Sequence, residues 1–514
     1  MTDYIKQKLI AMSGVMLALL LAALDQTAIN TALPQISAEL GDFELYSWVF
    51  TAYMLASTTC VPIVGKLSDI YGRRPLLLLG IVIFLLGSAL CGLAPSMRVL
   101  IAFRALQGIG AGLIMANTFA IIGDIFTPAE RGRWQGLIGA VFGLASIIGP
   151  LVGGFLTDNL SWRWVFYINL PVGILAFSVI MVTMPYIKPQ GKSNVDYAGA
   201  GLLILGVVPL LLAFTWAGQE YAWFSLQIIS MFIIAAVALT AFFQVERRAA
   251  QPIIPLDLFK NPIFSLSVFI VFLTGIGFFG SMMFIPLFVQ GVGGSSATAS
   301  GMVLMPMMLA NVVSSTLSGQ ALSRWGHYKL WSIAGFAFLT LGLGLSAMMT
   351  EQTSSLVLIR NMVIMGMGIG ISMPLFVLIV QNALPHKMLG VATSSIQFFR
   401  QIGGTIGVAL MGSLMTFSLK SQMSEFEGAS LAGVGNNLGQ LQALLKNPEQ
   451  FGLSPQTLLL FREAMAVSIT RVFLVAALLM AAGIIAAFFL KEIPLSQSHE
   501  DEINHEHAES TVKV

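Results

Sequence analysis

Long apolar runs separated by short polar segments dominate the pattern of the chain. A run of about 18–25 apolar residues forms a helix long enough to cross the hydrocarbon core of a bilayer. The chain contains fourteen such runs, which predicts an all-α integral membrane protein. The predicted helices lie at about 11–33, 47–66, 75–94, 98–122, 133–157, 163–184, 197–216, 225–244, 263–290, 298–321, 330–349, 353–381, 391–416 and 465–490.

A weak internal repeat groups these helices into halves. The segment Gly65–Pro75 matches 319–329 at an offset of 254 residues, and the same offset carries 149–153 onto 403–407. Matches at one offset predict two duplicated six-helix bundles in parallel orientation, as in two-lobed secondary transporters. The expected domains are an N-terminal six-helix bundle over 1–190, an inserted helix pair over 191–250, a C-terminal six-helix bundle over 251–495 with an external loop at 417–464, and a disordered cytoplasmic tail over 496–514.

Composition agrees with a protein that faces lipid. Of its 514 residues, 56% are hydrophobic and only 10% are charged, whereas a soluble domain carries about 25% charged residues. A net charge of +2 is too small to indicate a nucleic-acid partner. Cys60 and Cys91 both fall in apolar runs, so neither a disulfide nor a metal site is expected.

The sequence disfavours an enzyme and an ATP-driven pump. All five histidines lie in loops or in the tail. Neither a His-Glu-x-x-His pattern nor a phosphate-binding Gly-x-x-x-x-Gly-Lys-Ser/Thr loop occurs. We therefore expect no cofactor. If the protein is a secondary transporter, we expect protons to be its coupling ion.

Lysine and arginine are distributed unequally between the connecting segments. With an even number of helices and both termini inside, 17 of the 26 basic residues lie in inner segments and 5 lie in outer ones. Basic residues concentrate on the cytoplasmic side of membrane proteins. The sequence therefore predicts a multi-pass protein of the cell membrane with both termini in the cytoplasm.

One carboxylate, Asp25, lies deep in the first apolar run. A charge near the bilayer centre costs at least about 2.5–3.5 kcal/mol and usually faces a bundle interior. Arg104 lies at a depth only about 3 Å different, at 1.5 Å of rise per residue. A nearby guanidinium favours the ionised carboxylate, whereas burial favours the protonated one. We predict that Asp25 carries a proton and that Arg104 modulates its proton affinity; the alternative is a fixed structural pair.

A conformational latch is predicted in the loop between the second and third helices. Its glycines allow a tight turn and a close helix contact. Its acid can pair with an arginine or accept hydrogen bonds from a neighbouring helix N-terminus. Such contacts form in one conformation and break in the other; the alternative is a basic anchor that does not switch. The latch residues are Gly65, Asp69, Gly72, Arg73 and Arg74.

The helix at 133–157 is rich in glycine. Small residues four apart allow helices to pack closely, and a proline inside a helix produces a kink. The sequence therefore predicts a close helix contact here, which is either ordinary helix packing or part of a functional element. The residues concerned are Gly143, Gly149, Pro150, Gly153 and Gly154.

These motifs resemble those of a known family. The Gly65–Pro75 loop is similar to the signature loop of the major facilitator superfamily, Leu100–Gly112 to its fourth-helix arginine motif and Gly143–Gly154 to its fifth-helix antiporter motif. Leu24–Pro34, Arg400–Gly407 and the fourteen helices resemble the EmrB/QacA branch of drug:proton antiporters. The resemblance implies alternating access, with the antiporter motif closing an outer gate or shaping an inward-open state.

A substrate cavity is predicted from polar groups inside the spans and from soft apolar surface. Methionine and aromatic side chains suit promiscuous binding, although they are also ordinary packing residues. The charge of Arg400 needs either an acidic partner or an anionic ligand, and the latter would favour anionic or zwitterionic substrates. The candidate lining residues are Asn30, Gln107, Phe278, Met282, Asn311, Gln397, Arg400 and Gln401.

The leading hypothesis is a proton-driven exporter of small amphiphilic drugs that works as a monomer in the lipid bilayer by alternating access. An exporter of an endogenous lipid, siderophore or other metabolite is the alternative. A non-transport membrane protein is a further possibility. We identify no second acid well inside a span, which predicts a low proton stoichiometry and argues against dicationic substrates.

Overall fold

The computed structural model is all-helical, as the sequence predicts. Fourteen of its helical segments are long and apolar enough to cross a membrane. The structure describes residues 2–41, 45, 48–185, 195–218, 220–293, 297–385, 388–424 and 455–493. Within these ranges the only β pairing is an isolated bridge between Ala217 and Tyr221.

The described helices fall into two halves and an inserted pair. The N-terminal half contains α1 (Thr2–Leu40), α2 (Trp48–Tyr71), α3 (Arg73–Gly92), α4 (Met97–Ile125), α5 (Pro128–Asn159), α6 (Trp164–Tyr167) and α7 (Asn169–Thr183), of which α6 and α7 share one span. The inserted pair is α8 (Tyr197–Trp216) and α9 (Leu226–Glu246). The C-terminal half contains the short 3-10 helix η2 (Leu256–Lys260), α10 (Pro262–Gly291), α11 (Ala297–Trp325), α12 (Tyr328–Ala347), α13 (Ser355–Ala383), α14 (Leu389–Ser424) and α16 (Pro455–Phe488).

Several helices are longer than their apolar runs. Helix α1 continues to Leu40, α14 continues to Ser424, and α16 begins at Pro455. Both flanking helices therefore extend into the segment predicted as an external loop at 417–464. The length of an apolar run reports the thickness of the bilayer, whereas a helix satisfies its own backbone and can continue into water. The rest of this loop, 425–454, and the tail from 494 lie outside the described residues.

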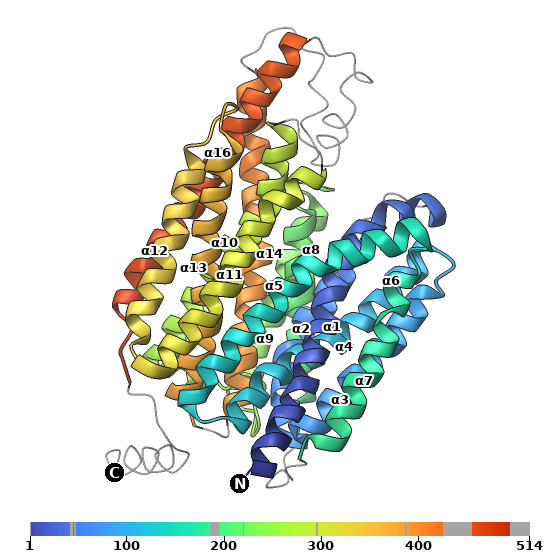
Figure 1. Ribbon diagram of the computed structural model, residues 1–514, viewed down its shortest axis with the longest axis vertical. Coiled ribbons are helices and arrows are strands. Elements are labelled where there is room, and N and C mark those ends of the chain that lie inside the picture. Colours follow the sequence, from blue (N-terminus) through green and yellow to red (C-terminus); the bar gives the residue numbers. More distant parts are fainter. Residues whose placement is uncertain are drawn as a thin grey trace.

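The two halves lie side by side, with the N-terminal half coloured blue to green-cyan and the C-terminal half yellow-green to red (Figure 1). In one half α1 packs on α5, while α2 and α3 pack on α4. In the other, α10 packs on α14, while α11 and α12 pack on α13. The first helix of each half thus packs on the fifth, and the second and third pack on the fourth, as expected for a duplicated bundle. Helix α8 packs on α9 and also contacts α2 and α14, so the inserted pair lies along the seam between the halves.

Two equivalent contacts join the halves: α2 against α14, and α5 against α11. Gly65 of α2 approaches Ser394 of α14 so closely that a methyl group would overlap it, and Gly319 of α11 approaches the backbone of α5 in the same way. Gly65 and Gly319 are separated by the offset of the sequence repeat. The matched loop glycines Gly72 and Gly326 both have positive φ, 93° and 70°, a region that favours glycine. The repeat in the sequence therefore corresponds to a repeat in the seam.

Candidate functional site

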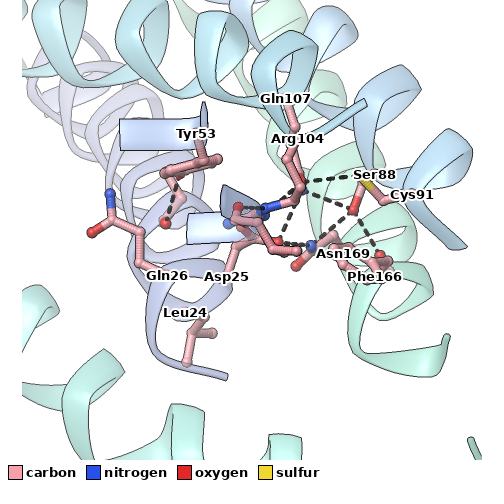
Figure 2. Close-up of polar contacts among 12 residues, drawn as sticks. Leu24, Asp25, Gln26, Tyr53, Ser88, Cys91, Arg104, Gln107, Phe166 and Asn169 are labelled. Carbon is pink, nitrogen blue, oxygen red and sulfur yellow. Dashed lines mark hydrogen bonds and ion pairs between the residues drawn. The ribbon is translucent and has the colours of Figure 1, made fainter. Parts of the chain in front are cut away.

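The buried acid Asp25 lies against Arg104 inside the N-terminal half (Figure 2). Arg104 Nη1 donates to Asp25 Oδ2 at 2.5 Å. Asp25 belongs to α1, and Arg104 lies two turns into α4. The side chains are 1% and 0% exposed, respectively. The proximity predicted from their similar depths is confirmed, and the pair is sealed from solvent.

Amide side chains complete the shell around the carboxylate. Gln107 Nε2 and Asn169 Nδ2 donate to Asp25 Oδ1 at 2.9 and 3.0 Å. The same amides donate to Ser88 Oγ, which in turn donates to the Phe166 carbonyl at 2.8 Å. Three donors on one carboxyl group fit its ionised form, which accepts and does not donate. Because the shell comes from α1, α3, α4 and α7, any shift of these helices changes the environment of the acid.

Arg104 has partners besides the carboxylate. Its Nε donates to the Val49 carbonyl at 3.2 Å, and its Nη1 also donates to Gln107 Oε1 at 2.7 Å. The guanidinium carbon lies 4.3 Å from the centroid of the Tyr53 ring, a cation–π contact. These contacts hold the cation in place independently of Asp25. Arg104 therefore has partners other than the carboxylate.

At the end of the molecule where α1 begins, Asp69 and Arg73 form a salt bridge. Arg73 Nη2 lies 2.5 Å from Asp69 Oδ1, and Arg73 Nε donates to Asp124 Oδ2 of α4 at 2.8 Å. The second oxygen of Asp69 accepts from the backbone N–H of Val391, in the first turn of α14, at 3.2 Å. A methyl group on Gly390 would overlap both Asp69 and Arg73. The loop predicted as a latch therefore ties α2, α3 and α4 to the opposite half.

Other hydrogen bonds between the halves lie toward the same end. Gln381 Nε2, near the end of α13, donates to the Phe119 carbonyl of α4 at 3.1 Å. A further bond, from Thr58 of α2 to Gln401 of α14, lies about halfway along α2 and about a third of the way along α14. The latch and the bond of Gln381 close the described halves against each other at the end where α1 begins, and the bond of Thr58 joins them deeper in the spans.

The glycines of α5 seat it against two other helices. Gly149 and Gly153 face α1, and Gly143 faces α11 across the seam. Pro150 lies inside the helix between them. A Cβ on Gly154 would meet nothing within 4 Å, so this glycine takes no part in the packing. Helix α5 thus connects α1, which carries the acid, with the opposite half.

A cavity of about 290 Å³ lies between α2, α8, α10 and α14. Its walls are mainly aromatic and aliphatic, with hydroxyl groups and one amide among them. Apolar walls with a few polar groups are typical of sites for small amphiphilic ligands. Prominent lining residues are Phe50, Met54, Phe214, Phe279, Met283 and Gln401.

The sequence located this cavity only in part. Gln401 lines it as predicted, but Phe278 and Met282 do not; their neighbours Phe279 and Met283 do. The reason is helical geometry, since a shift of one residue turns the side chain by about 100° around the helix. The two candidates chosen on α10 therefore lie in the segment that lines the cavity, but on a neighbouring face of the helix.

Other predicted residues lie away from the cavity. Gln107 belongs to the shell of Asp25 instead. Asn30 is exposed on α1, and Asn311 is buried in α11. Arg74 lies beside the latch, where its Nη2 donates to the Met181 carbonyl of α7 at 2.5 Å. Polarity within a span therefore did not by itself identify the role of a residue.

Several site residues were missed by the sequence reasoning. Ser88 and Asn169 are polar residues inside spans, the same signal that selected Gln107. Asp124 lies just beyond the predicted limit of its helix, although α4 continues to Ile125. The contact at Val391 is a backbone donor, for which a side-chain pattern gives no signal.

Buried Arg400 lies in α14, with its guanidinium directed along the helix to Gln397. Gln397 Oε1 accepts from Arg400 Nη2. Neither residue is among those that line the cavity, although Gln401 and Gly404 next to them are. No acidic side chain in the described part of the chain forms a salt bridge with Arg400.

Two helical bundles that pack against each other across a seam, one of them enclosing a buried acid and its arginine, have the architecture of a membrane transporter. The sequence pattern of the Major Facilitator Superfamily matches residues 15–408. The chain is 39% identical to multidrug transporter protein MdtP of Bacillus subtilis, over 99% of this chain and 97% of that protein. It is 40% identical to multidrug resistance protein 3 of the same organism, over 90% and 91%. The chain belongs to the Major Facilitator Superfamily.

More distant relatives are also transport proteins. The efflux pump FUS6 of Gibberella fujikuroi is 31% identical over 96% of this chain and 90% of its own length. Among solved structures, the proton:xylose symporter XylE matches with a TM-score of 0.61 at 13% identity, over 95% of this chain and 98% of that one. Human MFSD10, an organic anion transporter, matches with a TM-score of 0.59 at 16% identity, over 92% and 99%. At these identities the structural matches establish the fold alone.

Proposed function

We propose that the protein exports small amphiphilic drugs by proton-coupled antiport, with Asp25 as the proton carrier. The observation that carries this proposal is the sealed pair of Asp25 and Arg104, 2.5 Å apart in the interior of one bundle. Relatives named as multidrug transporters and efflux pumps support the class of substrate and the direction of transport.

Proton transfer follows from the two states of the carboxyl group. In the closed arrangement Asp25 is ionised and bound to Arg104. When helix movement exposes Asp25 to the outside and moves it from Arg104, a proton adds to one carboxylate oxygen. The proton leaves after the halves have opened toward the other side, where the guanidinium again approaches the carboxylate and favours its ionised form. The partners that Arg104 keeps, Val49 and Gln107, allow both steps.

The cavity lined by Phe214 and Phe279 is the proposed substrate site. It borders both halves, so helix movements that open and close the halves also change its shape. The hydrogen bond between Thr58 and Gln401 crosses this region, and a bound substrate would compete for these groups. Binding and the opening of the seam are then coupled through a shared set of contacts.

The end closed by the latch is assigned to the cytoplasm. Basic residues gather at this end of the described helices, and such residues are retained on the cytoplasmic side. The structure would then be closed to the cytoplasm. Members of this basic set are Lys66, Arg73, Arg131, Arg247 and Lys329.

Transport in proteoliposomes tests the proposal. With ethidium as the probe and an imposed proton gradient, the native protein is expected to move the dye. Asp25→Asn is expected to reduce gradient-driven movement at least about tenfold, because it removes the group that titrates. Equal transport by the variant would place proton coupling elsewhere. Absence of movement by the native protein would contradict drug export and favour an endogenous lipid or metabolite as substrate.

A further inference from the structure

Arg400 differs from the other buried arginines in its partners. Arg104 pairs with Asp25, and Arg73 pairs with two aspartates. Arg131, 0% exposed, donates to three backbone carbonyls. Arg400 is 9% exposed, and the one side chain that accepts from it in the described structure is the neutral amide of Gln397. Its charge is therefore uncompensated within the part of the chain that the structure describes.

None of the described acids of the C-terminal half forms a salt bridge with Arg400. Those in described positions are at helix ends or in connecting segments: Asp257, Glu351, Glu463 and Glu492. Arg400, in contrast, is eleven residues into the span that begins at Leu389, which corresponds to about 16 Å of helix. The span continues to Gln422, so Arg400 lies about a third of the way along it, well inside a segment long enough to cross a hydrocarbon core of about 30 Å.

The groups around Arg400 present hydrogen-bond donors. Gln397 uses its Oε1 for Arg400, and its Nε2 is buried with no acceptor in the described structure. Gln397, Arg400 and Gly404 follow one another at spacings of three and four residues, so they share a face of α14. Gly404 lines the cavity. The face thus leads from the cavity to a set of N–H groups that lack an acceptor.

We propose that Arg400 and Gln397 bind the anionic group of an amphiphilic substrate, with a carboxylate as the best fit. A guanidinium binds a carboxylate through two parallel hydrogen bonds, which gives both affinity and orientation. The apolar part of the substrate would occupy the cavity next to Gly404. This inference rests on the proposed function and narrows its substrates to organic anions and zwitterions. The depth of Arg400 places the site away from the head groups of bulk lipid.

The sign of the substrate charge has a consequence for energetics. If one proton enters on Asp25 while a cation with one charge leaves, no net charge crosses the membrane. If a monoanion leaves instead, two positive charges move inward per cycle. Export of an anion is then driven by an inside-negative membrane potential as well as by the proton gradient.

Binding of a matched pair of probes tests the site. Dansylglycine and dansylglycinamide share the same apolar body and differ in the carboxylate. The native protein, in nanodiscs of phosphatidylcholine, is expected to bind the carboxylate at least about tenfold more tightly than the amide, a difference of about 1.4 kcal/mol. Arg400→Gln is expected to remove this preference, and Arg400→Lys is expected to keep part of it. The control Arg471→Gln changes an exposed arginine of α16 that donates to Ser418 at 3.0 Å, and it should keep the full preference.

Several outcomes would overturn the inference. They are equal binding of the two probes by the native protein, a preference that survives in Arg400→Gln, and loss of carboxylate binding when phosphatidylglycerol is added, which would assign the site to a lipid head group.

If Arg400→Gln fails to fold, the native protein alone still tests whether the substrate is an anion. Its efflux of dansylglycine from preloaded vesicles must accelerate at inside-negative potential, whereas ethidium antiport must not. If the proton gradient moves neither probe, the proposed function fails; if it moves ethidium but no carboxylate preference exists, this inference alone fails.

Discussion

Asp25 shows how a charge is held inside an apolar helix. Its oxygens accept three hydrogen bonds, from Arg104, Gln107 and Asn169, which replace the water that burial removes. All of these residues belong to the N-terminal half. At the repeat offset of 254 residues, Asp25 corresponds to Phe279, which lines the cavity. The equivalent positions of the two halves therefore hold a titratable group on one side and a cavity wall on the other.

Removal of Arg104 tests how strongly the pair is coupled. Arg104→Gln leaves Asp25 buried with two amide donors, and breaking a buried pair in this way costs about 3–5 kcal/mol. The variant is expected to melt at a clearly lower temperature than the native protein at pH 8. The double variant with Asp25→Asn removes both charges and should recover part of the loss. Tryptophan fluorescence during thermal melting in detergent measures the stability of each variant. A double variant less stable than Arg104→Gln alone would contradict the account.

For single residues, the sequence predicts a contact when two charged residues, which are rare inside spans, lie at a similar depth in the membrane. Asp25 and Arg104 satisfy that condition, and they do meet. Asn169 and Ser88 could not be assigned to the shell, because neutral polar residues are common in spans and their helix faces are unknown before the helices are packed. The amide of Gln107 was selected for the same polarity and assigned to the wrong site.

Among the elements, the latch between α2 and α14 depends most on charge. Asp69 accepts from the α14 backbone and pairs with Arg73, and both side chains are about 10% exposed. Asp69→Asn removes the charge from both contacts, so we expect this end to open several-fold more often. Thr393 of α14 is 0% exposed and can report the opening. In a background with its native cysteines replaced by serine, Thr393→Cys should react several-fold faster with N-ethylmaleimide when Asp69→Asn is also present.

The control for this experiment is an acid at the other end of the molecule. Asp158 is exposed near the end of α5, far along the helix from the latch. Asp158→Asn should leave the reaction rate of Thr393→Cys unchanged. If Asp69→Asn also leaves it unchanged, the loop is an anchor and not a latch.

Helix α8 is expected to take part in substrate binding, although it lies outside the duplicated halves. Phe214 lines the cavity and makes edge-to-face contact with Phe232 at 5.2 Å. Aromatic contacts contribute about 0.5–1.5 kcal/mol, so Phe214→Ala should weaken the apparent affinity for ethidium by about three- to tenfold. Phe243→Ala on α9, where the ring is 50% exposed, is the matched control and should have no effect. The dependence of export on ethidium concentration gives the apparent affinity of each variant. If Phe214→Ala has the same affinity as the native protein, α8 is excluded from the site.

Apolar run length predicts which segments form helices but not where the helices end. All fourteen predicted runs correspond to helical spans, because a lipid environment requires every backbone group to be satisfied within the segment. The extensions of α1 and α14 beyond the apolar runs contain polar residues and carry no hydropathy signal. The role of α8 as a cavity wall also has no signal in its own sequence, since it arises from packing against α2 and α14.

For the whole molecule, the essential feature is that closure of one end coincides with a sealed acid. The latch and the bond between Gln381 and Phe119 close the halves where α1 begins, while Asp25 is 1% exposed. Helix α5 contacts both α1 and α11, so movement of the halves is transmitted to the helix that carries the acid. The proposed coupling therefore predicts that proton affinity and the opening of the seam change together.

The most direct test is proton release induced by substrate. Ethidium is added to the purified native protein in weakly buffered detergent near neutral pH, and an indicator dye records the protons released. Because binding of substrate and binding of the proton are linked reciprocally, the account predicts release of up to about one proton per molecule. The Asp25→Asn protein should release none. No release by the native protein on ethidium binding, or the same release by the variant, would contradict the assignment of Asp25 as the proton carrier.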